Sequence, residues 1–144
     1  TAVDIFHLQD MAGNAFNRPS MLAKMAVYIE QSLDGSLDVS QALAHRAKPY
    51  ETKNSRIKKE GLVFIENDAS AVCSVIEIAA SDRIGLLYDV ASALTKLGLS
   101  IVTAHISTYG TQAADVFYVK NAFGLKITHP DKIKSVREAL GRVL

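Results

Sequence analysis

One change of hydrophobic rhythm constrains the fold more than any other feature of this sequence. Between residues 75 and 80 apolar side chains alternate as in a strand, and from Leu86 they recur every three or four positions as in a helix. Residues 82–87, Asp-Arg-Ile-Gly-Leu-Leu, make the change. We expect Asp82 to cap the new helix and Gly85 to leave room for a ligand. The first N–H groups of a helix lack internal partners and carry partial positive charge, so a carboxylate or phosphate can bind there.

The order of the elements around this switch predicts the fold class. A strand over residues 73–80 leads into the helix, whose apolar stripe runs from Leu86 to Leu97 and which Gly98 ends. Strands over 99–109 and 115–120 then form a hairpin, and a second helix begins at Pro130. Strand, helix, strand, strand and helix are five of the six elements of a ferredoxin-like βαββαβ unit, which is an α+β fold.

The first 33 residues repeat the end of this unit at an offset of 111 positions. The identities fall at strand, turn and helix-start positions: Asp4 with Asp115, Phe6 with Phe117, Gly13 with Gly124, Pro19 with Pro130 and Leu33 with Leu144. We therefore predict one nearly complete module preceded by the second half of another, with a strand around Phe6 and Leu8. The predicted domains are a half module over 1–34, a basic linker over 35–61, and a second module over 62–144.

The predicted linker contains a short helix over residues 39–46, which Ser36 or Asp38 would cap. A run of basic residues follows: Arg46, Lys48, Lys53, Arg56, Lys58 and Lys59. Because Tyr50 is the single aromatic residue among them, a solvated connector is favoured over a nucleic-acid contact. A short apolar strand over 63–65 comes next, and the sequence leaves open which module it completes. The half module leaves strand edges unpaired, so we expect at least a homodimer.

Bulk properties exclude several classes of protein. The net charge of +1 indicates no whole-chain attraction to nucleic acid, and no apolar run approaches the roughly 20 residues that span a bilayer. The single cysteine, Cys73, excludes an internal disulfide and fits the reducing cytoplasm, and its apolar neighbours favour a buried position. The chain begins without Met and in the middle of an expected element, which indicates a piece of a longer protein.

Catalytic and metal-binding patterns are missing from the sequence. The four histidines lack metal-ligand spacing, and neither a glycine-rich phosphate loop nor a nucleophile elbow is present. We predict a binding module with no catalytic residues, no metal and no cofactor of its own. The helix start suits a zwitterion, whose carboxylate would meet the N–H groups of residues 85–87 and whose ammonium would meet Asp82. Thr103, His105 and Ser107, from this chain or a neighbouring subunit, would contact the ligand's side chain. The alternative for residues 82–87 is purely structural, with Leu86 and Leu87 in the core.

The loop and the hairpin resemble one family. Residues 82–87 are similar to the Asp-Arg-Pro-Gly-Leu-Leu signature of ACT domains, the amino-acid-sensing modules of metabolic enzymes. The hairpin segments Ala-His-Ile-Ser-Thr-Tyr-Gly (104–110) and Asp-Val-Phe-Tyr-Val-Lys (115–120), with Phe-Gly-Leu-Lys-Ile (123–127), resemble the last ACT domain of bacterial PII uridylyltransferase/uridylyl-removing enzymes. Residues 1–33 resemble the end of the preceding ACT domain of those enzymes.

The resemblance implies a glutamine sensor that biases the transfer of uridylyl groups to the PII signalling protein and their removal. It implies that residues 82–87 form the ligand loop, and it places magnesium in nucleotidyltransferase and hydrolase domains upstream of this chain. The main predicted ligand-binding residues are Asp82, Arg83, Ile84, Gly85, Leu86, Leu87, Thr103 and His105.

Ile84 departs from the family signature, which has proline at this position. Proline presets the backbone of a first helical turn, so its absence costs about 0.4–1 kcal/mol of preorganisation. Three other functions compete with sensing. They are an ACT module that acts only in oligomerisation or protein contact, a ferredoxin-like enzyme such as an acylphosphatase with Arg83 as phosphate clamp, and an RNA-binding sheet. The last would require paired aromatic residues on the central strands.

Overall fold

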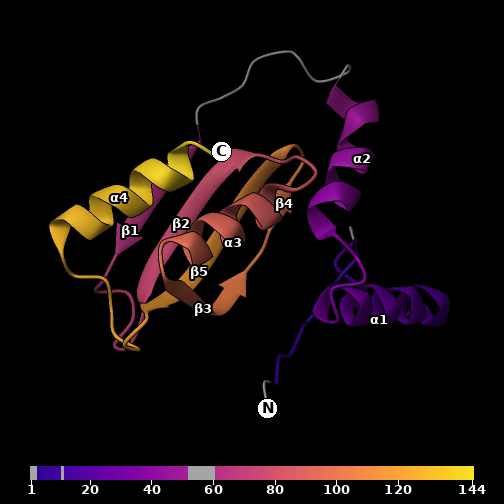
Figure 1. The fold of residues 1–144 in the computed structure, drawn as a ribbon, viewed down its shortest axis with the longest axis horizontal. Helices are drawn as coiled ribbons and strands as arrows, with labels where there is room; N and C mark the ends of the chain where they lie inside the picture. Colours follow the sequence, from indigo (N-terminus) through magenta and orange to yellow (C-terminus); the bar gives the residue numbers. More distant parts are fainter. Residues whose placement is uncertain (1–2, 11, 52–60) are drawn as a thin grey trace. The chain divides into compact units, whose positions relative to one another are not determined.

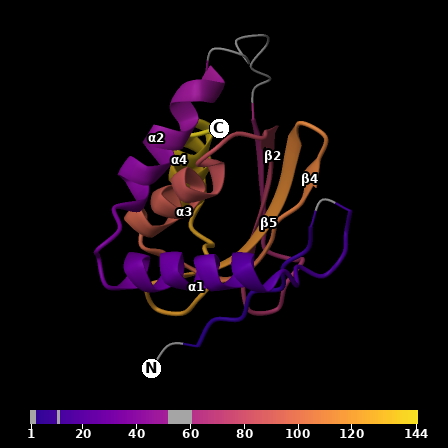
Figure 2. The same ribbon diagram turned by 90° about the vertical axis from the view of Figure 1, so that its right-hand side faces the viewer.

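Residues 3–10, 12–51 and 61–144 are described by the computed structural model, which divides the chain into two units, Thr1–His45 and Arg46–Leu144 (Figure 1). The second unit contains the sheet. Its strands are β1 (Leu62–Glu66), β2 (Ser74–Ser81), β3 (Leu99–His105), β4 (Thr108–Tyr109) and β5 (Gln112–Asn121). Its helices α3 (Leu86–Lys96) and α4 (Pro130–Gly141) lie together on one face of the sheet, as Figure 2 shows from the side.

All neighbouring strands of the sheet are antiparallel, in the order β1-β2-β5-β3, and β4 also pairs with β5. From β2 onward the elements follow the predicted order strand, helix, strand, strand, helix. The arrangement confirms the predicted α+β, ferredoxin-like fold. The expected single strand over 99–109 is divided at Ile106 and Ser107 into β3 and β4.

Strand β1 stands where the sixth element of a ferredoxin-like unit would stand. That element would follow α4 and pair with the first strand of the unit, which here is β2. Instead β1, which precedes β2 in sequence, pairs with it along the whole of Leu62–Glu66. The residue before β1 lies against the last residue of the chain, because a Cβ added at Gly61 would meet Leu144 Cδ1 at 2.7 Å. The apolar segment 63–65 therefore completes the sheet of the second unit, in a circularly permuted connection.

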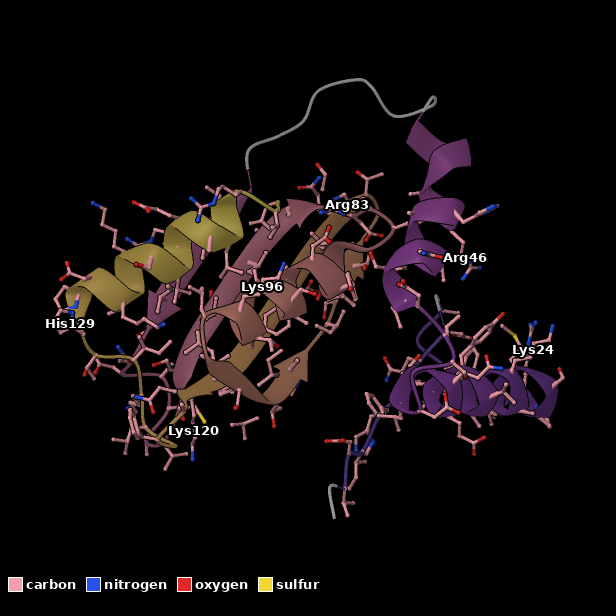
Figure 3. All side chains as sticks on the ribbon, in the orientation of Figure 1. Lys24, Arg46, Arg83, Lys96, Lys120 and His129 are labelled. Carbon is pink, nitrogen blue, oxygen red and sulfur yellow. The ribbon has the colours of Figure 1, made fainter. Side chains whose placement is uncertain are left out.

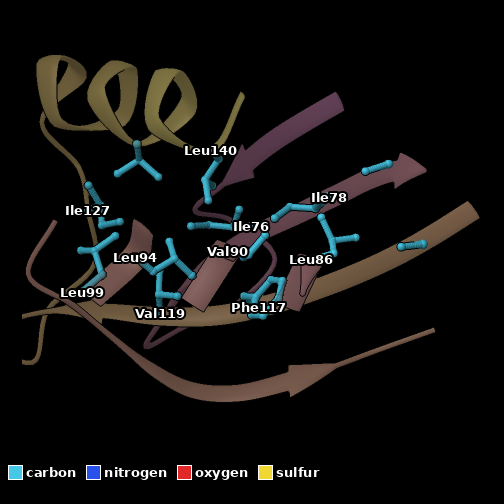
Figure 4. Packing of buried hydrophobic residues seen from close by; sticks show 13 residues of the cluster. Ile76, Ile78, Leu86, Val90, Leu94, Leu99, Phe117, Val119, Ile127 and Leu140 are labelled. Atoms are coloured by element: carbon cyan, nitrogen blue, oxygen red, sulfur yellow. The ribbon is translucent and has the colours of Figure 1, made fainter. Parts of the chain in front are cut away.

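The core lies between the sheet and the two helices (Figure 4). The fully buried residues of the helices follow the predicted stripes: Leu86, Val90 and Leu94 on α3, and Val136 and Leu140 on α4. Phe117 and Val119 of β5 belong to the same buried cluster, and Cys73 is buried as expected. Leu87, which the structural alternative for residues 82–87 placed in the core, is 43% exposed.

A buried polar network closes the end of the sheet where β2 begins. The hydroxyl of Ser74 donates to Asn67 Oδ1 at 2.6 Å and accepts from the N–H of Ile127 at 2.8 Å. The side-chain amide of Asn67 donates to the carbonyl of Ile127 at 2.9 Å. The turn between β1 and β2 is thus tied to the segment that enters α4, and each buried polar group has a partner.

An extra residue in β3 determines which side chains face the helices. Ile101 pairs with Val119, and the next paired residue is Thr103 opposite Tyr118, so Val102 forms a β-bulge. Directly opposed residues of an antiparallel pair share a face. Ile101 therefore lies on the helix side with Val119, while Thr103 lies with Tyr118 on the helix-free side.

Helix α1 (Pro19–Leu33) lies in the first unit, and α2 (Val39–Glu51) begins in the first unit and runs past the division at His45 into the second. Helix α1 begins at its proline, as predicted. The helix expected over 39–46 continues five residues further, and Asp38 caps it, because its Oδ1 accepts from the N–H of Gln41 at 3.0 Å. The basic residues between positions 52 and 60 lie outside the described residues, so the solvated connector remains a prediction.

The turn before α1 has the same hydrogen bonds as the turn 111 positions later. Asp10 Oδ1 accepts from the N–H groups two and four residues ahead, both at 2.9 Å. Asn121 Oδ1 accepts the same two bonds, at 2.9 and 3.0 Å. Gly13 and Gly124 both adopt a left-handed backbone, with φ of 81° and 75°. The repeat found in the sequence therefore extends to the backbone of the turn.

The strand predicted around Phe6 and Leu8 is wrong for this chain. Residues 3–10 show a single isolated bridge, between Gln9 and Ala15. A strand needs a neighbouring backbone to accept and donate its hydrogen bonds, and within the described residues the segment 3–10 meets one only at the Gln9–Ala15 bridge. As a result Phe6, whose counterpart Phe117 is buried, is 68% exposed.

Candidate ligand-binding site

The loop between β2 and α3 brings residues 82–87 together, but its cap differs from the one predicted. Gly85 occupies the N-cap position with φ of 85°, and no side chain caps the helix. The expectation that Asp82 caps α3 is therefore wrong, because the left-handed glycine starts the helix three residues later. The Asp82 side chain is exposed, and its N–H donates to the carbonyl of Thr111 at 2.9 Å. This bond holds the loop beside the turn of the β4–β5 hairpin.

The helix start retains part of the expected anion site. The N–H of Leu86 donates to the carbonyl of Arg83 at 3.2 Å, so one of the three amides expected to meet a carboxylate is engaged. The first helical bond runs from the N–H of Asp89 to the carbonyl of Gly85 at 2.9 Å. The N–H of Leu87 lies in the first turn, where no helical carbonyl precedes it. A carboxylate placed at Gly85 and Leu87 would also meet the positive end of the helix dipole.

Arg83 ties the loop to the end of α4 (Figure 3). Its guanidinium donates to Asp89 Oδ2 at 2.5 Å and to the carbonyl of Val143 at 2.6 Å. A third bond reaches the carbonyl of Ile84 at 3.3 Å. The loop, the first turn of α3 and the end of α4 therefore share one side chain. Direct contact between Arg83 and a ligand stays a prediction, and the bonds described give Arg83 a structural role.

Thr103 and His105 lie on a different part of the module from the loop. Their partners Tyr118 and Val116 place them on the helix-free face of the sheet. The ring of His105 meets that of Tyr118 edge to face, with centroids 5.9 Å apart and an interplanar angle of 76°. The loop instead leads into a helix on the other face. One copy of the chain thus brings 82–87 together and leaves Thr103 and His105 apart from them, so their role in binding remains a prediction.

Asp115 is a residue near the loop that the sequence reasoning missed. It is only 2% exposed and lies on the helix-facing side of β5, between Ala113 and Phe117. Its Oδ1 accepts from the N–H of Ser107 at 3.2 Å. Burial raises the pKa of the Asp115 carboxyl, the bond from Ser107 opposes that rise, and the negative charge of Asp82 adds to it. The sequence signal for Asp115 is an acidic residue at a position of the strand where the alternation calls for an apolar one.

Replacing Asp115 with Asn should change how stability depends on pH. An acid whose pKa is raised in the folded state binds its proton more tightly there, so protonation favours folding. We expect Asp115→Asn to be more stable than wild type at neutral pH. The difference should shrink as the pH falls from neutral through the raised folded-state pKa of Asp115 towards about 4, the ordinary pKa of an aspartate in an unfolded chain. Urea unfolding of both proteins across this range measures it, and a difference independent of pH would contradict the shift.

Two further kinds of site were sought in the described part of the chain. Residues 3–10, 12–51 and 61–144 contain no group of three or more His, Cys, Asp or Glu side chains placed to hold a metal ion. Within the same ranges, no helix combines the length and the apolar character needed to cross a membrane.

Comparison with known proteins places the second unit in a family. The model of the "ACR family N-terminal ACT domain" matches residues 69–143. Curated relatives share the name bifunctional uridylyltransferase/uridylyl-removing enzyme. The protein from Azospirillum brasilense is 46% identical over 140 residues, and that from Gluconobacter oxydans is 41% identical over 140. That from Rhodospirillum rubrum is 37% identical over 139. Each match covers 96% of this chain and 15% of the relative, so the chain spans a small part of their length.

Proposed function

The chain belongs to the ACT-domain family, and we propose that it is the glutamine-sensing regulatory module of an enzyme that uridylylates the PII signalling protein and removes the uridylyl groups again. The observation that carries this proposal is the 46% identity across nearly the whole chain to a bifunctional uridylyltransferase/uridylyl-removing enzyme. The enzyme's catalytic domains, with their magnesium, would lie outside this chain, in the cytoplasm with it.

The loop geometry supports an amino acid as the ligand. The carboxylate would meet the N–H groups of Gly85 and Leu87 at the positive end of α3. The ammonium would meet the carboxylate of Asp82, which is an exposed residue of the same loop. Leu86 is buried and anchors the helix start in the core, so the ligand amides would already be in position before binding. A zwitterion satisfies both ends of this arrangement.

Glutamine would regulate by binding one arrangement of the ACT modules better than another. A ligand shifts a conformational equilibrium only by the difference between its affinities for the two states. The turn shared by residues 10–14 and 121–125 supports reading residues 1–34 as the second half of a preceding ACT module. The two modules and the attached catalytic domains would then move together on binding.

Substitution of Gly85 by Val should abolish glutamine binding. Gly85 has a left-handed φ of 85°, which a β-branched residue adopts only at a cost of about 1–2 kcal/mol, and the new side chain would stand at the ligand amides. Gly98→Val is the matched control, because its φ of 72° imposes similar strain at the other end of α3. Titration calorimetry with glutamine should show binding by wild type and Gly98→Val. Loss of binding in both variants, or in neither, would count against a site at this loop.

A second function, association without ligand binding, is favoured by the open edge of the sheet. Strand β3 is an edge strand, and every residue after its first is exposed. Such an edge can pair with another chain, and we propose that it supports homo-oligomerisation. Under this alternative Gly85→Val leaves association intact, and wild type shows no heat with glutamine. A monomer by light scattering at working concentration would contradict the proposed homo-oligomer, whether or not glutamine binds.

A further inference from the structure

At the corner between β3 and β4, a hydrogen bond to the side chain of Asp115 replaces one of the backbone hydrogen bonds of the ladder. Ser107 lies between the pairs His105–Val116 and Thr108–Ala113. Its carbonyl accepts from the N–H of Ala114 at 2.8 Å, as in a regular antiparallel pair. Its N–H, however, donates to the carboxylate of Asp115 at 3.2 Å. The carboxylate therefore replaces a backbone carbonyl in the ladder.

The hairpin that leaves this corner reaches the ligand loop. Strand β4 pairs with β5 through Thr108–Ala113 and Tyr109–Gln112, and the turn follows. The carbonyl of Thr111, in that turn, accepts from the N–H of Asp82 at 2.9 Å. Asp115 is thus connected to the first residue of the loop through its bond to Ser107, the β4–β5 pairs and the bond at Thr111.

Burial makes this position costly for an acid. In the described part of the chain, Asp115 and Ser74 are the buried polar side chains, and Ser74 has its own network where β2 begins. An apolar residue on the helix-facing side of β5 would avoid the cost of removing a carboxyl group from water. The bond to Ser107 is the contact that an apolar residue cannot supply.

We propose that Asp115 is a positioning residue for the ligand loop. Its carboxylate holds the β3–β4 corner, and the hairpin then holds Asp82 where it receives the ammonium group of the ligand. The role of Asp82 rests on the proposed glutamine site. The positioning of the Asp82 backbone can be measured without any ligand.

The test compares two replacements of Asp115 in the whole chain. Asp115→Asn keeps an oxygen that accepts from Ser107, whereas Asp115→Ala removes the acceptor and leaves a cavity. Val119→Ala is the matched control, since it makes a buried cavity further along the same face of β5. Amide exchange at Ser107 and Asp82 reports the two bonds, and calorimetry reports the dissociation constant of glutamine. Should Asp115→Ala fail to fold, Ser107→Pro removes the same bond from the donor side.

We expect Asp115→Ala to speed exchange at both amides and to weaken glutamine binding by about tenfold, the usual weight of one hydrogen bond. Asp115→Asn should stay close to wild type in both measurements. Protected amides in Asp115→Ala, or equal loosening in Val119→Ala or in Asp115→Asn, would overturn the positioning role. A wild type that does not bind glutamine, with loosened amides in Asp115→Ala alone, would overturn the proposed function and leave the positioning role standing.

Discussion

Deletion of residues 61–66 is expected to unfold the second unit, and insertion of the same six residues after Leu144 is expected to restore it. Strand β1 closes one edge of the sheet, and Val63 and Ile65 pack against the core. Val63 and Ile65 are partly buried, so losing their burial costs at most about 3–6 kcal/mol, and the loss of the β1–β2 backbone pairs adds to this cost. Because Gly61 lies against Leu144, the moved strand can return to its place with a short linker.

Circular dichroism and urea unfolding of the deleted and the permuted chains measure this effect. A permuted chain with Val63 and Ile65 both changed to Asp is the control, since it has the same connection without the apolar contacts. Two results would contradict the structural role of β1. The deleted chain would unfold at the same urea concentration as wild type, or the permuted chain would be no more stable than the deleted one.

Leu140→Ala should destabilise the second unit by about 2–5 kcal/mol, whereas Ile29→Ala should change stability by no more than about 0.5 kcal/mol. The two residues occupy equivalent positions, 111 apart, on α4 and α1. Leu140 is fully buried, and its removal leaves a cavity, while Ile29 is 40% exposed on a helix with no buried residues. Thermal or urea unfolding of the two variants provides the comparison.

The same pair tests the proposal that residues 1–34 are half of an ACT module. If a preceding strand, helix and strand of a longer protein cover α1, Ile29→Ala should cost as much there as Leu140→Ala does. If Ile29→Ala leaves the free energy of unfolding of the longer protein nearly unchanged, then no preceding strand or helix covers α1. The apolar stripe of Leu22, Met25 and Ile29 would then need another explanation.

Much of the second unit was predictable because its signals are local. The switch from strand to helix at residues 82–87, the glycine after α3 and the proline at the start of α4 each act within a few residues. The place of β1 was not predictable, because it depends on pairing with β2 and on the approach of Gly61 to Leu144. The strand predicted around Phe6 also depended on a distant partner, and in the described part of the chain residues 3–10 pair only through the bridge between Gln9 and Ala15.

The sequence predicted which residues form the loop of the candidate site, but it did not predict how they and their neighbours are arranged in space. The loop residues 82–87 are contiguous, so their grouping follows from the chain itself. The sequence predicts Asp82 as the cap because aspartate is a common N-cap residue. In the structure the left-handed backbone of Gly85 makes Gly85 the N-cap, which residue type alone does not predict. Asp115 was not predicted as part of the site, because its role depends on a hydrogen bond from the N–H of Ser107 on the neighbouring chain segment. Thr103 and His105 face away from the helices, although strict alternation from Leu99 would place them on the helix side.

The cause of this difference is the extra residue at Val102, and it has a consequence for how such modules diverge. In regular alternation from Leu99, which is buried on the helix side, Thr103 and His105 would face the helices as well. Loss of the codon for Val102 would leave Ile101 opposite Val119 and Thr103 opposite Tyr118, so Thr103 and His105 would keep the helix-free face in a ladder without the bulge. A β-bulge on an edge strand can thus absorb a single-codon insertion or deletion, and such an evolutionary step leaves unchanged both the chemistry of the open sheet surface and the loop at Gly85.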